Sequence, residues 1–321
     1  MIRTRLTARY HLTHPILSAP MALASGGALA AAVSRAGGLG FIGGAYGDAA
    51  WIMRAFQEAG GARVGCGFIT WKLAETPELL TRVLERRPAA LFLSFGDPAP
   101  FADQIATAGV PLICQVQTLR DAQHAADVGA DVIVAQGAEA GGHGEKRATM
   151  TLVPEVADWL AVHAPDVLLL AAGGIADGRG LAASLMLGAD GVLVGSRLWA
   201  STESLAHPEM VKAAIAATGD DTIRSTVMDV ARGLNWPARY TARVLKNAFT
   251  DRWHDDPGGL LRLAETEAAR WSAAWEAGDV EVANTFVGEV AGLIRGCEPA
   301  GEIVRAMATE AEALLQGFSG A

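Results

Sequence analysis

Two stretches of the sequence follow one pattern, VGADVIVAQG at residues 128–137 and LGADGVLVGS at residues 187–196. Each begins as the end of a helix, turns at Gly-Ala-Asp and continues as a short apolar strand. Their starting positions, 128 and 187, are 59 residues apart, which is the length of two strand–helix units. A repeat of this kind favours a parallel sheet built from alternating strands and helices.

The same alternation extends over the first 205 residues. Short apolar runs predict eight strands, at residues 16–19, 39–42, 64–69, 90–93, 112–115, 132–135, 167–171 and 191–194. Helices are predicted between them, at residues 27–35, 49–58, 77–86, 100–108, 119–128, 153–163 and 178–187. The alternative, an open doubly wound sheet, usually stops at about five to seven strands. We therefore predict an α/β fold, a (β/α)8 TIM barrel, over residues 1–205.

The pattern changes from Leu205 onward, where no clear strand signal remains. Helices are predicted at residues 208–217, 238–249, 260–278 and 303–316. We expect residues 206–321 to form a C-terminal helical extension that packs on the barrel or covers its mouth. Four of the eight tryptophans lie in this part, which fits either core packing or a contact with substrate or a second subunit.

The composition limits the partners. The net charge is −9 and no Lys/Arg cluster follows one face, so no nucleic acid is expected. No unbroken apolar stretch approaches the roughly 20 residues of a membrane helix, so no membrane association is expected. Cys66, Cys114 and Cys297 have neither metal nor disulfide spacing, which favours a cytoplasmic protein. His11 and His14 have no acid or thiol ligand beside them, and no metal site is expected.

The predicted carboxyl ends of the eight strands carry almost no charge. In a TIM barrel these ends hold the catalytic residues. This rim lacks the carboxylate pairs of a hydrolase and is typical of a pocket for a flat, largely neutral cofactor. The residues at the strand ends are Ala19, Pro20, Met21, Gly43, Gly44, Thr70, Ser94, Phe95, Gln115, Gln136, Gly173, Gly174, Gly195 and Ser196.

Two glycine-containing loops follow the last two predicted strands, AAGGIADGRG at residues 171–180 and VGSRLWAS at residues 194–201. TIM barrels commonly bind phosphate between these two loops. Glycine lets the main chain approach the anion, amide N–H groups point at it, and a helix N-terminus adds partial positive charge. Ser196 can add a hydroxyl donor. The alternative is that the glycines only serve tight turns, but their presence in both loops predicts a phosphate site.

The stretch VIVAQGAEAGGHGEKRATM, residues 132–150, ends a strand in glycines around one histidine. Gln136 supplies an amide that both donates and accepts hydrogen bonds. Gly141 and Gly142 leave room for a planar ring against the main chain. His143 would lie at the edge of that ring, where an imidazole can take or give a proton near neutral pH. The alternative is a structural or exposed histidine.

These motifs resemble the nitronate monooxygenase family, formerly called 2-nitropropane dioxygenases. The resemblance extends from about Pro15 to Phe249 and rests on PILSAPM, AVSRAGGLGFIGG, AQGAEAGGHG, AAGGIADGRGLAASLMLGADGVLVGSR and GLNWPARYTARVLKNAF. It implies an FMN-dependent barrel that oxidises alkyl nitronates with dioxygen to carbonyl compounds and nitrite. The nitronate and dioxygen would be its small-molecule partners, and a homo-oligomer is possible.

The resemblance also assigns residues. His143 matches the active-site histidine of the family, and Gly173, Gly174, Gly195 and Ser196 match its phosphate site. All positions that it places at FMN are Ala19, Pro20, Met21, Gly67, Gln115, Gln136, Gly141, Gly142, Gly173, Gly174, Gly195 and Ser196. Two of them depart from the family. Relatives commonly carry an asparagine that contacts the flavin where this chain has Gly67, and some carry lysine at Gln115.

The resemblance leaves alternatives for the reaction. EAGGH and AAGGIADGRG also occur in FMN-dependent enoyl-ACP reductases, and NADH:quinone reductases share the fold. An NAD(P)H-dependent FMN reductase of either type is therefore one alternative. A non-catalytic FMN-binding protein is another, and a phosphate-binding barrel isomerase or lyase without flavin is a third.

Overall fold

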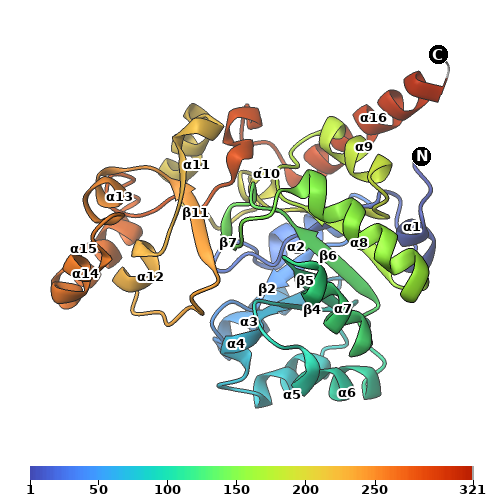
Figure 1. The fold of residues 1–321 in the computed structure, drawn as a ribbon, viewed down its shortest axis with the longest axis horizontal. Helices are drawn as coiled ribbons and strands as arrows, with labels where there is room; N and C mark the ends of the chain where they lie inside the picture. Colours follow the sequence, from blue (N-terminus) through green and yellow to red (C-terminus); the bar gives the residue numbers. More distant parts are fainter. Residues whose placement is uncertain (320–321) are drawn as a thin grey trace.

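The computed structural model describes residues 1–319 and shows eight parallel strands surrounded by helices (Figure 1). The strands are β1 (Ile16–Ser18), β2 (Phe41–Gly43), β3 (Gly65–Ile69), β4 (Leu91–Ser94), β5 (Leu112–Val116), β6 (Val132–Gln136), β8 (Leu168–Ala172) and β9 (Gly191–Val194). Their order in the sheet is β1-β9-β8-β6-β5-β4-β3-β2. Leu17 of β1 also pairs with Leu39, just before β2, so the two ends of the sheet meet. The predicted TIM barrel is confirmed, and every predicted strand overlaps an observed one.

The helices of the barrel alternate with these strands. They are α2 (Gly27–Arg35), α3 (Ala49–Glu58), α5 (Glu78–Leu84), α6 (Ala99–Thr107), α7 (Leu119–Asp127), α8 (Thr149–His163) and α9 (Gly178–Met186), with a short α4 (Thr70–Leu73) after β3. Side-chain caps define several of their starts, because an oxygen at the N-cap accepts from otherwise unpaired amides. Asp48 accepts from the amide of Trp51, and Thr118 from that of Asp121.

Apolar side chains cover both faces of the barrel strands, as expected for a parallel sheet that is buried on both sides. Phe41 and Phe92 meet edge to face inside the barrel, with ring centroids 5.7 Å apart. Leu6 and Tyr10 of α1 (Arg5–Tyr10) join the same cluster. Packed side chains therefore fill the barrel interior, and the functional cavity lies at the carboxyl ends of the strands.

The chain after β9 contains strands as well as helices. The helices are α10 (Ser196–Trp199), α11 (Pro208–Ala216), α12 (Val227–Ala231), α13 (Ala248–Trp253), α14 (Pro257–Arg262) and α15 (Ala264–Ala277), with 3-10 turns η1 (Gly219–Asp221) and η2 (Glu289–Leu293). Strand β11 (Thr241–Leu245) pairs antiparallel with β10 (Thr222–Ser225) and with β7 (Gly142–Gly144). A small sheet thus joins the loop after β6 to the later part of the chain.

The expectation of no strand signal after Leu205 was wrong, and so was most of the helix predicted at residues 238–249. Ala, Arg and Leu favour a helix locally. In β11, however, the buried Ala242 and Val244 alternate with the partly exposed Thr241 and Arg243. This alternation suits a strand whose partner, β7, lies about 100 residues earlier in the chain. Pairing over that distance overrides local propensity.

The last helix, α16 (Ala300–Ser319), packs against α9 and α2 at the barrel wall. Ala300, Ile303 and Val304 join the core between the strands and helices. The division of the chain at residue 205 into a barrel and an extension remains a proposal, and α16 contributes to the barrel core under any division. Among residues 1–319, no helix is long and apolar enough to cross a membrane.

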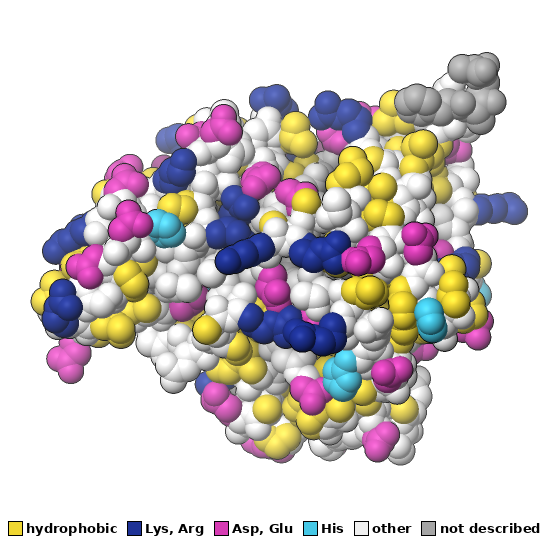
Figure 2. Space-filling view, in the orientation of Figure 1, with side chains coloured by type: hydrophobic (Ala, Val, Ile, Leu, Met, Phe, Trp, Pro, Cys, Tyr) yellow, Lys and Arg dark blue, Asp and Glu magenta, His cyan; other side chains and the backbone are white. Residues whose placement is uncertain are grey.

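Basic side chains gather near the middle of the face drawn in Figure 2, where Figure 1 places β7 and β11. Two arginines in or just before β11 have acidic partners. Arg243 pairs with Glu289 at 2.8 Å, and Arg239 pairs with Asp121 and Glu145. These ion pairs neutralise part of the positive charge on this face.

Candidate active site

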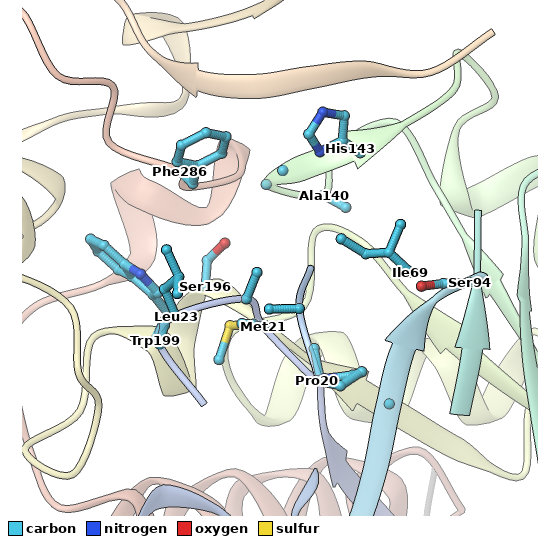
Figure 3. A pocket seen from close by; sticks show the side chains of 18 of the residues that line it. Pro20, Met21, Leu23, Ile69, Ser94, Ala140, His143, Ser196, Trp199 and Phe286 are labelled. Atoms are coloured by element: carbon cyan, nitrogen blue, oxygen red, sulfur yellow. The ribbon is translucent and has the colours of Figure 1, made fainter. Parts of the chain in front are cut away.

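One cavity of about 310 Å³ lies between the carboxyl ends of the barrel strands and the later part of the chain (Figure 3). The thirteen residues that the resemblance assigned to FMN or to catalysis all line it, namely Ala19, Pro20, Met21, Gly67, Gln115, Gln136, Gly141, Gly142, His143, Gly173, Gly174, Gly195 and Ser196, whereas the strand-end residues Gly43, Gly44 and Thr70 do not. Of the described residues that line the cavity, only Glu139 and Arg232 are of a type charged at neutral pH. A volume of this size and an apolar lining suit a small organic ligand.

The two loops after β8 and β9, here called the glycine loops (residues 173–174 and 195–196), expose main-chain donors. Gly173 and Gly174 have φ angles of +97° and +74°, which glycine adopts readily. Within the described chain, the amides of these two residues and those of Gly195 and Ser196 donate no hydrogen bond. A Cβ at Gly195 would meet no atom closer than 3.8 Å. Free amides beside open space suit an anion.

The sequence predicted that a helix N-terminus would add partial positive charge at the phosphate site, but the first amides of α9 are already bound by carboxylates. The Asp177 carboxylate accepts from the amides of Arg179 and Gly180, and Glu310 accepts from the amide of Gly178. At α8, the Glu139 carboxylate accepts from the amide and hydroxyl of Thr149. Carboxylates thus occupy both helix starts, and the glycine loops themselves supply the free donors. The Ser196 hydroxyl accepts from the amide of Gly288 at 2.9 Å, which leaves its own hydrogen free to donate.

Gly67 lies where Pro20 crosses β3. A Cβ at position 67 would lie 2.5 Å from Cβ and Cγ of Pro20 and 3.1 Å from Cβ of Phe92. An asparagine therefore cannot occupy this position unless Pro20 moves. A glycine at this position thus has a structural reason in this chain, which is the close packing of Pro20, after β1, onto β3.

Two glutamines line the cavity, and they differ in whether their side-chain amides are hydrogen-bonded. Gln136 is fixed, because its Nε2 donates to the carbonyl of His143 at 3.1 Å and its Oε1 accepts from Gln117 at 2.8 Å. The side-chain amide of Gln115 has no hydrogen-bond partner among residues 1–319. Gln115 is therefore free to bind a ligand, while Gln136 holds the strand that carries His143.

The glycine pair before the histidine serves two purposes. A Cβ at Gly141 would lie 2.5 Å from the amide nitrogen of Gly288, so this glycine lets the later chain pass. Gly142 has a φ of +71° and open space where its Cβ would lie. Only the second position therefore leaves room on the cavity side. His143 follows in β7, where it pairs with Ala242 of β11.

His143 is held by two side chains from the later chain, and we call His143, Asp229 and Trp236 the histidine wall. The Nε2 of His143 lies 2.9 Å from Oδ2 of Asp229 in α12, and both side chains are buried, with exposed fractions of 7% and 4%. The indole of Trp236 stacks on the imidazole, with ring centroids 3.4 Å apart and planes 6° apart. The ring is thus fixed both at its edge and on one face.

Burial lowers the pKa of His143 below its usual 6.5, although the hydrogen bond to Asp229 opposes this shift. The positive charges of Arg232 and Arg224 act in the same direction as burial. The imidazole is therefore neutral at pH 7 and able to accept a proton.

Sequence analysis did not identify Asp229 or Trp236. Trp236 lies in GLNWPARY, which carried part of the family resemblance, and it was predicted only as one of four tryptophans in core packing or in a contact with substrate or a second subunit. Asp229 is 86 positions from His143, and no spacing rule connects them. Further aromatic side chains surround the wall. Phe95 and Trp71 meet Trp236 edge to face at 5.2 Å and 5.4 Å.

Comparisons with known proteins show the family of the chain. A sequence model of the family "Nitronate monooxygenase" matches residues 3–60 and 70–310. A nitronate monooxygenase from Neurospora crassa is 33% identical, over 92% of this chain and 89% of its own. Among solved structures, FabK from Thermotoga maritima superposes with a TM-score of 0.87 and 30% identity, covering 100% of this chain and 99% of that one. Nitroalkane oxidase from Streptomyces ansochromogenes gives a TM-score of 0.82 and 25% identity, covering 97% and 99%.

Proposed function

The chain belongs to the nitronate monooxygenase family of oxidoreductases, and on that premise we propose that it binds FMN and oxidises alkyl nitronates with dioxygen to carbonyl compounds and nitrite. The observation that carries this proposal is the pairing of free main-chain donors in the glycine loops with a neutral cavity that ends at His143. The donors suit a phosphate, and the lining suits a flat ring system.

The residues present fit FMN in a consistent arrangement. The glycine loops and the Ser196 hydroxyl would hold the phosphate through N–H and O–H donors. The main chain at Ala19, Pro20 and Met21 would support the ring, and Gln115 would supply a free amide to its polar edge. Gln136, Gly141 and Gly142 would lie toward the ring and the ribityl chain. Gly67 has no side chain and would add no side-chain hydrogen bond. Pro20 fills the space that a side chain at this position would need.

FMN, when bound, would accept electrons from the substrate and pass them to dioxygen. The protein's own contribution is to bind and orient the substrate. The neutral ring of His143 would accept a proton when a neutral nitroalkane binds, and the protonated ring would donate a hydrogen bond to the nitro oxygens of a nitronate. The aromatic side chains around Trp236 would limit the access of water to this side of the cavity.

A spectrum of the purified protein, followed by two anaerobic titrations, tests the proposal. We expect the absorbance of a bound flavin, or its appearance after reconstitution with FMN. Addition of propyl-2-nitronate should bleach the flavin, and admission of air should restore it with release of nitrite. Bleaching by NADH but not by the nitronate would instead indicate an NAD(P)H-dependent reductase. No flavin absorbance after reconstitution would refute the cofactor itself.

We also propose a cytoplasmic location. All three cysteines are free thiols, and Cys66 and Cys114 are buried in the barrel. Burial raises the pKa of the Cys114 thiol to about 12 and holds it as an unreactive thiol. Free cysteines are typical of a reducing compartment. Cell fractionation should recover the protein with cytoplasmic markers, and recovery with a secreted fraction would contradict this.

A further inference from the structure

We propose that Asp229 is a positioning residue that holds His143 as the tautomer with its proton on Nε2, so that Nδ1 is the atom that takes a proton from a neutral nitroalkane. The inference rests on the proposed function and deepens it. It assigns the reacting nitrogen and gives a role to a residue that the sequence did not single out.

The first step is the hydrogen bond between the two side chains. A carboxylate only accepts hydrogen bonds, so at 2.9 Å the proton between Oδ2 of Asp229 and Nε2 of His143 belongs to the histidine. The neutral ring then carries its lone pair on Nδ1. Among residues 1–319, no group donates a hydrogen bond to Nδ1. Nδ1 is also not fully buried. Nδ1 is therefore available from the cavity that His143 lines.

The second step is the rigidity of the ring. Trp236 covers one face of the imidazole in a nearly parallel stack. The main chain on both sides of His143 is paired with β11, through Gly142 with Arg243 and through Gly144 with Thr241. Figure 3 shows the imidazole at the edge of the cavity. With the main chain and one face fixed, Asp229 determines which nitrogen carries the proton.

The third step concerns the carboxylate itself. Oδ1 of Asp229 is buried and has no hydrogen-bond partner within the described chain. Buried polar atoms without partners are rare and usually have a functional reason. Here the His143 ring is the one side chain shown to hydrogen-bond to this carboxylate. The negative charge of Asp229 would thus stabilise the positive charge that appears on the ring when Nδ1 takes a proton.

The proton transfer balances without another reactant. Nδ1 forms a bond to the hydrogen on the carbon that bears the nitro group, and that C–H bond breaks. Its electron pair becomes part of a C=N bond, and the negative charge moves to the nitro oxygens. The products are a nitronate and an imidazolium that faces Asp229. The nitronate is the substrate of the proposed oxidation, so the same cavity would generate and consume it.

The first test does not depend on catalysis. Nitrogen NMR of the full-length protein labelled with ¹⁵N-histidine, with the signal assigned by its loss in His143→Gln, reports which ring nitrogen carries hydrogen. At pH 8 we expect a protonated Nε2 and an unprotonated Nδ1 in the wild type. In Asp229→Asn this preference should weaken, and the pKa of His143 should fall further. A protonated Nδ1 in the wild type would overturn the inference.

The second test compares two substrates in each variant. With neutral 2-nitropropane, we expect Asp229→Asn to reduce kcat/KM by about 10² to 10⁴, the range that general acid–base catalysis contributes. With preformed propyl-2-nitronate, the loss should stay below about threefold, because no proton is taken from carbon. Asp251→Asn, at an exposed position in α13, is the matched control and should affect neither.

The outcomes separate the two proposals. A wild type that oxidises neither substrate refutes the proposed function, while the NMR result still decides the tautomer. A wild type that oxidises only the nitronate, or an Asp229→Asn variant that slows both substrates equally, refutes the inference alone. Partial recovery of the nitroalkane rate in Asp229→Glu, which retains the carboxylate, would support it.

Discussion

The two sides of the cavity differ in where their parts come from. The glycine loops belong to two consecutive strand–helix units, and each consists of two adjacent residues. The histidine wall combines β7 with side chains that follow 86 and 93 positions later, as the numbers of His143, Asp229 and Trp236 show. One side depends on bare main chain, and the other depends on packed side chains.

This difference indicates which function each side of the cavity performs. Main-chain amides are fixed by the barrel, and in the proposed function they would bind the phosphate of the cofactor. The wall is assembled by pairing between β7 and β11, so its side chains can change without changes in the barrel. We therefore expect the glycine loops to determine cofactor binding and the wall to determine which substrate reacts.

The largest expected effect comes from filling the glycine loops. In Gly195→Val, the new side chain would enter the open space beside Ala19 and Met21, where no described atom lies within 3.8 Å of the Cβ position. It would displace a bound phosphate. Loss of one or two hydrogen bonds to a charged group, at about 1.5–3 kcal/mol each, should weaken FMN binding by at least about tenfold.

The measurement is a fluorescence titration of the apoprotein with FMN. His143→Gln is the matched control from the other side of the cavity, and it should keep wild-type FMN affinity while losing nitroalkane turnover. If both variants lose FMN equally, the proposed separation between the two sides is wrong. The melting temperature of each apoprotein shows whether the fold is intact.

The sequence predicted one side of the site much better than the other, for physical reasons. Strand β9 and helices α2 and α3 matched their predicted bounds, because local apolar periodicity encodes them. Gly173, Gly174, Gly195 and Ser196 could be placed from their positions at strand ends. Asp229 and β11 could not, since their partners are distant in sequence and local propensity at residues 238–249 favoured a helix.

The role of Gly67 was also beyond the sequence. The residue type could be compared with the family pattern, but the pattern gave no reason for a glycine. The reason is a contact with Pro20, about 47 positions earlier, that only the packed barrel shows. The sequence therefore located this position on the cavity, but it did not reveal the contact that favours a glycine there.

The next largest effect tests that constraint. Gly67→Asn should destabilise the protein by about 1–3 kcal/mol, because its Cβ would overlap the ring of Pro20. Pro20→Gly in the same chain, which removes both Cβ and Cγ of the ring, should recover part of this loss. Urea unfolding of the two single variants and the double variant measures the coupling between them. Strictly additive changes in the free energy of unfolding would show that the two residues do not compete for space.

The smallest expected effect is a shift in the pH dependence of the rate, and it tests the histidine wall alone. Burial lowers the pKa of His143, opposed by Asp229 and reinforced by the nearby charges of Arg232 and Arg224. The unprotonated ring is the active form, so kcat/KM for a neutral nitroalkane should be full above this lowered pKa and fall as the pH drops through it. A histidine at its usual pKa of about 6.5 would lose roughly three quarters of the rate at pH 6.

We expect the rate of the wild type at pH 6 to stay above that level, and the acidic limb to move to still lower pH in Asp229→Asn because the carboxylate that raises the pKa is gone. The reaction of a preformed nitronate should lack this limb. Initial rates between pH 5 and 8, with both substrates, measure the effect. A midpoint at or above 6.5 for the nitroalkane would mean that the carboxylate outweighs burial, and the wall would then favour the protonated ring.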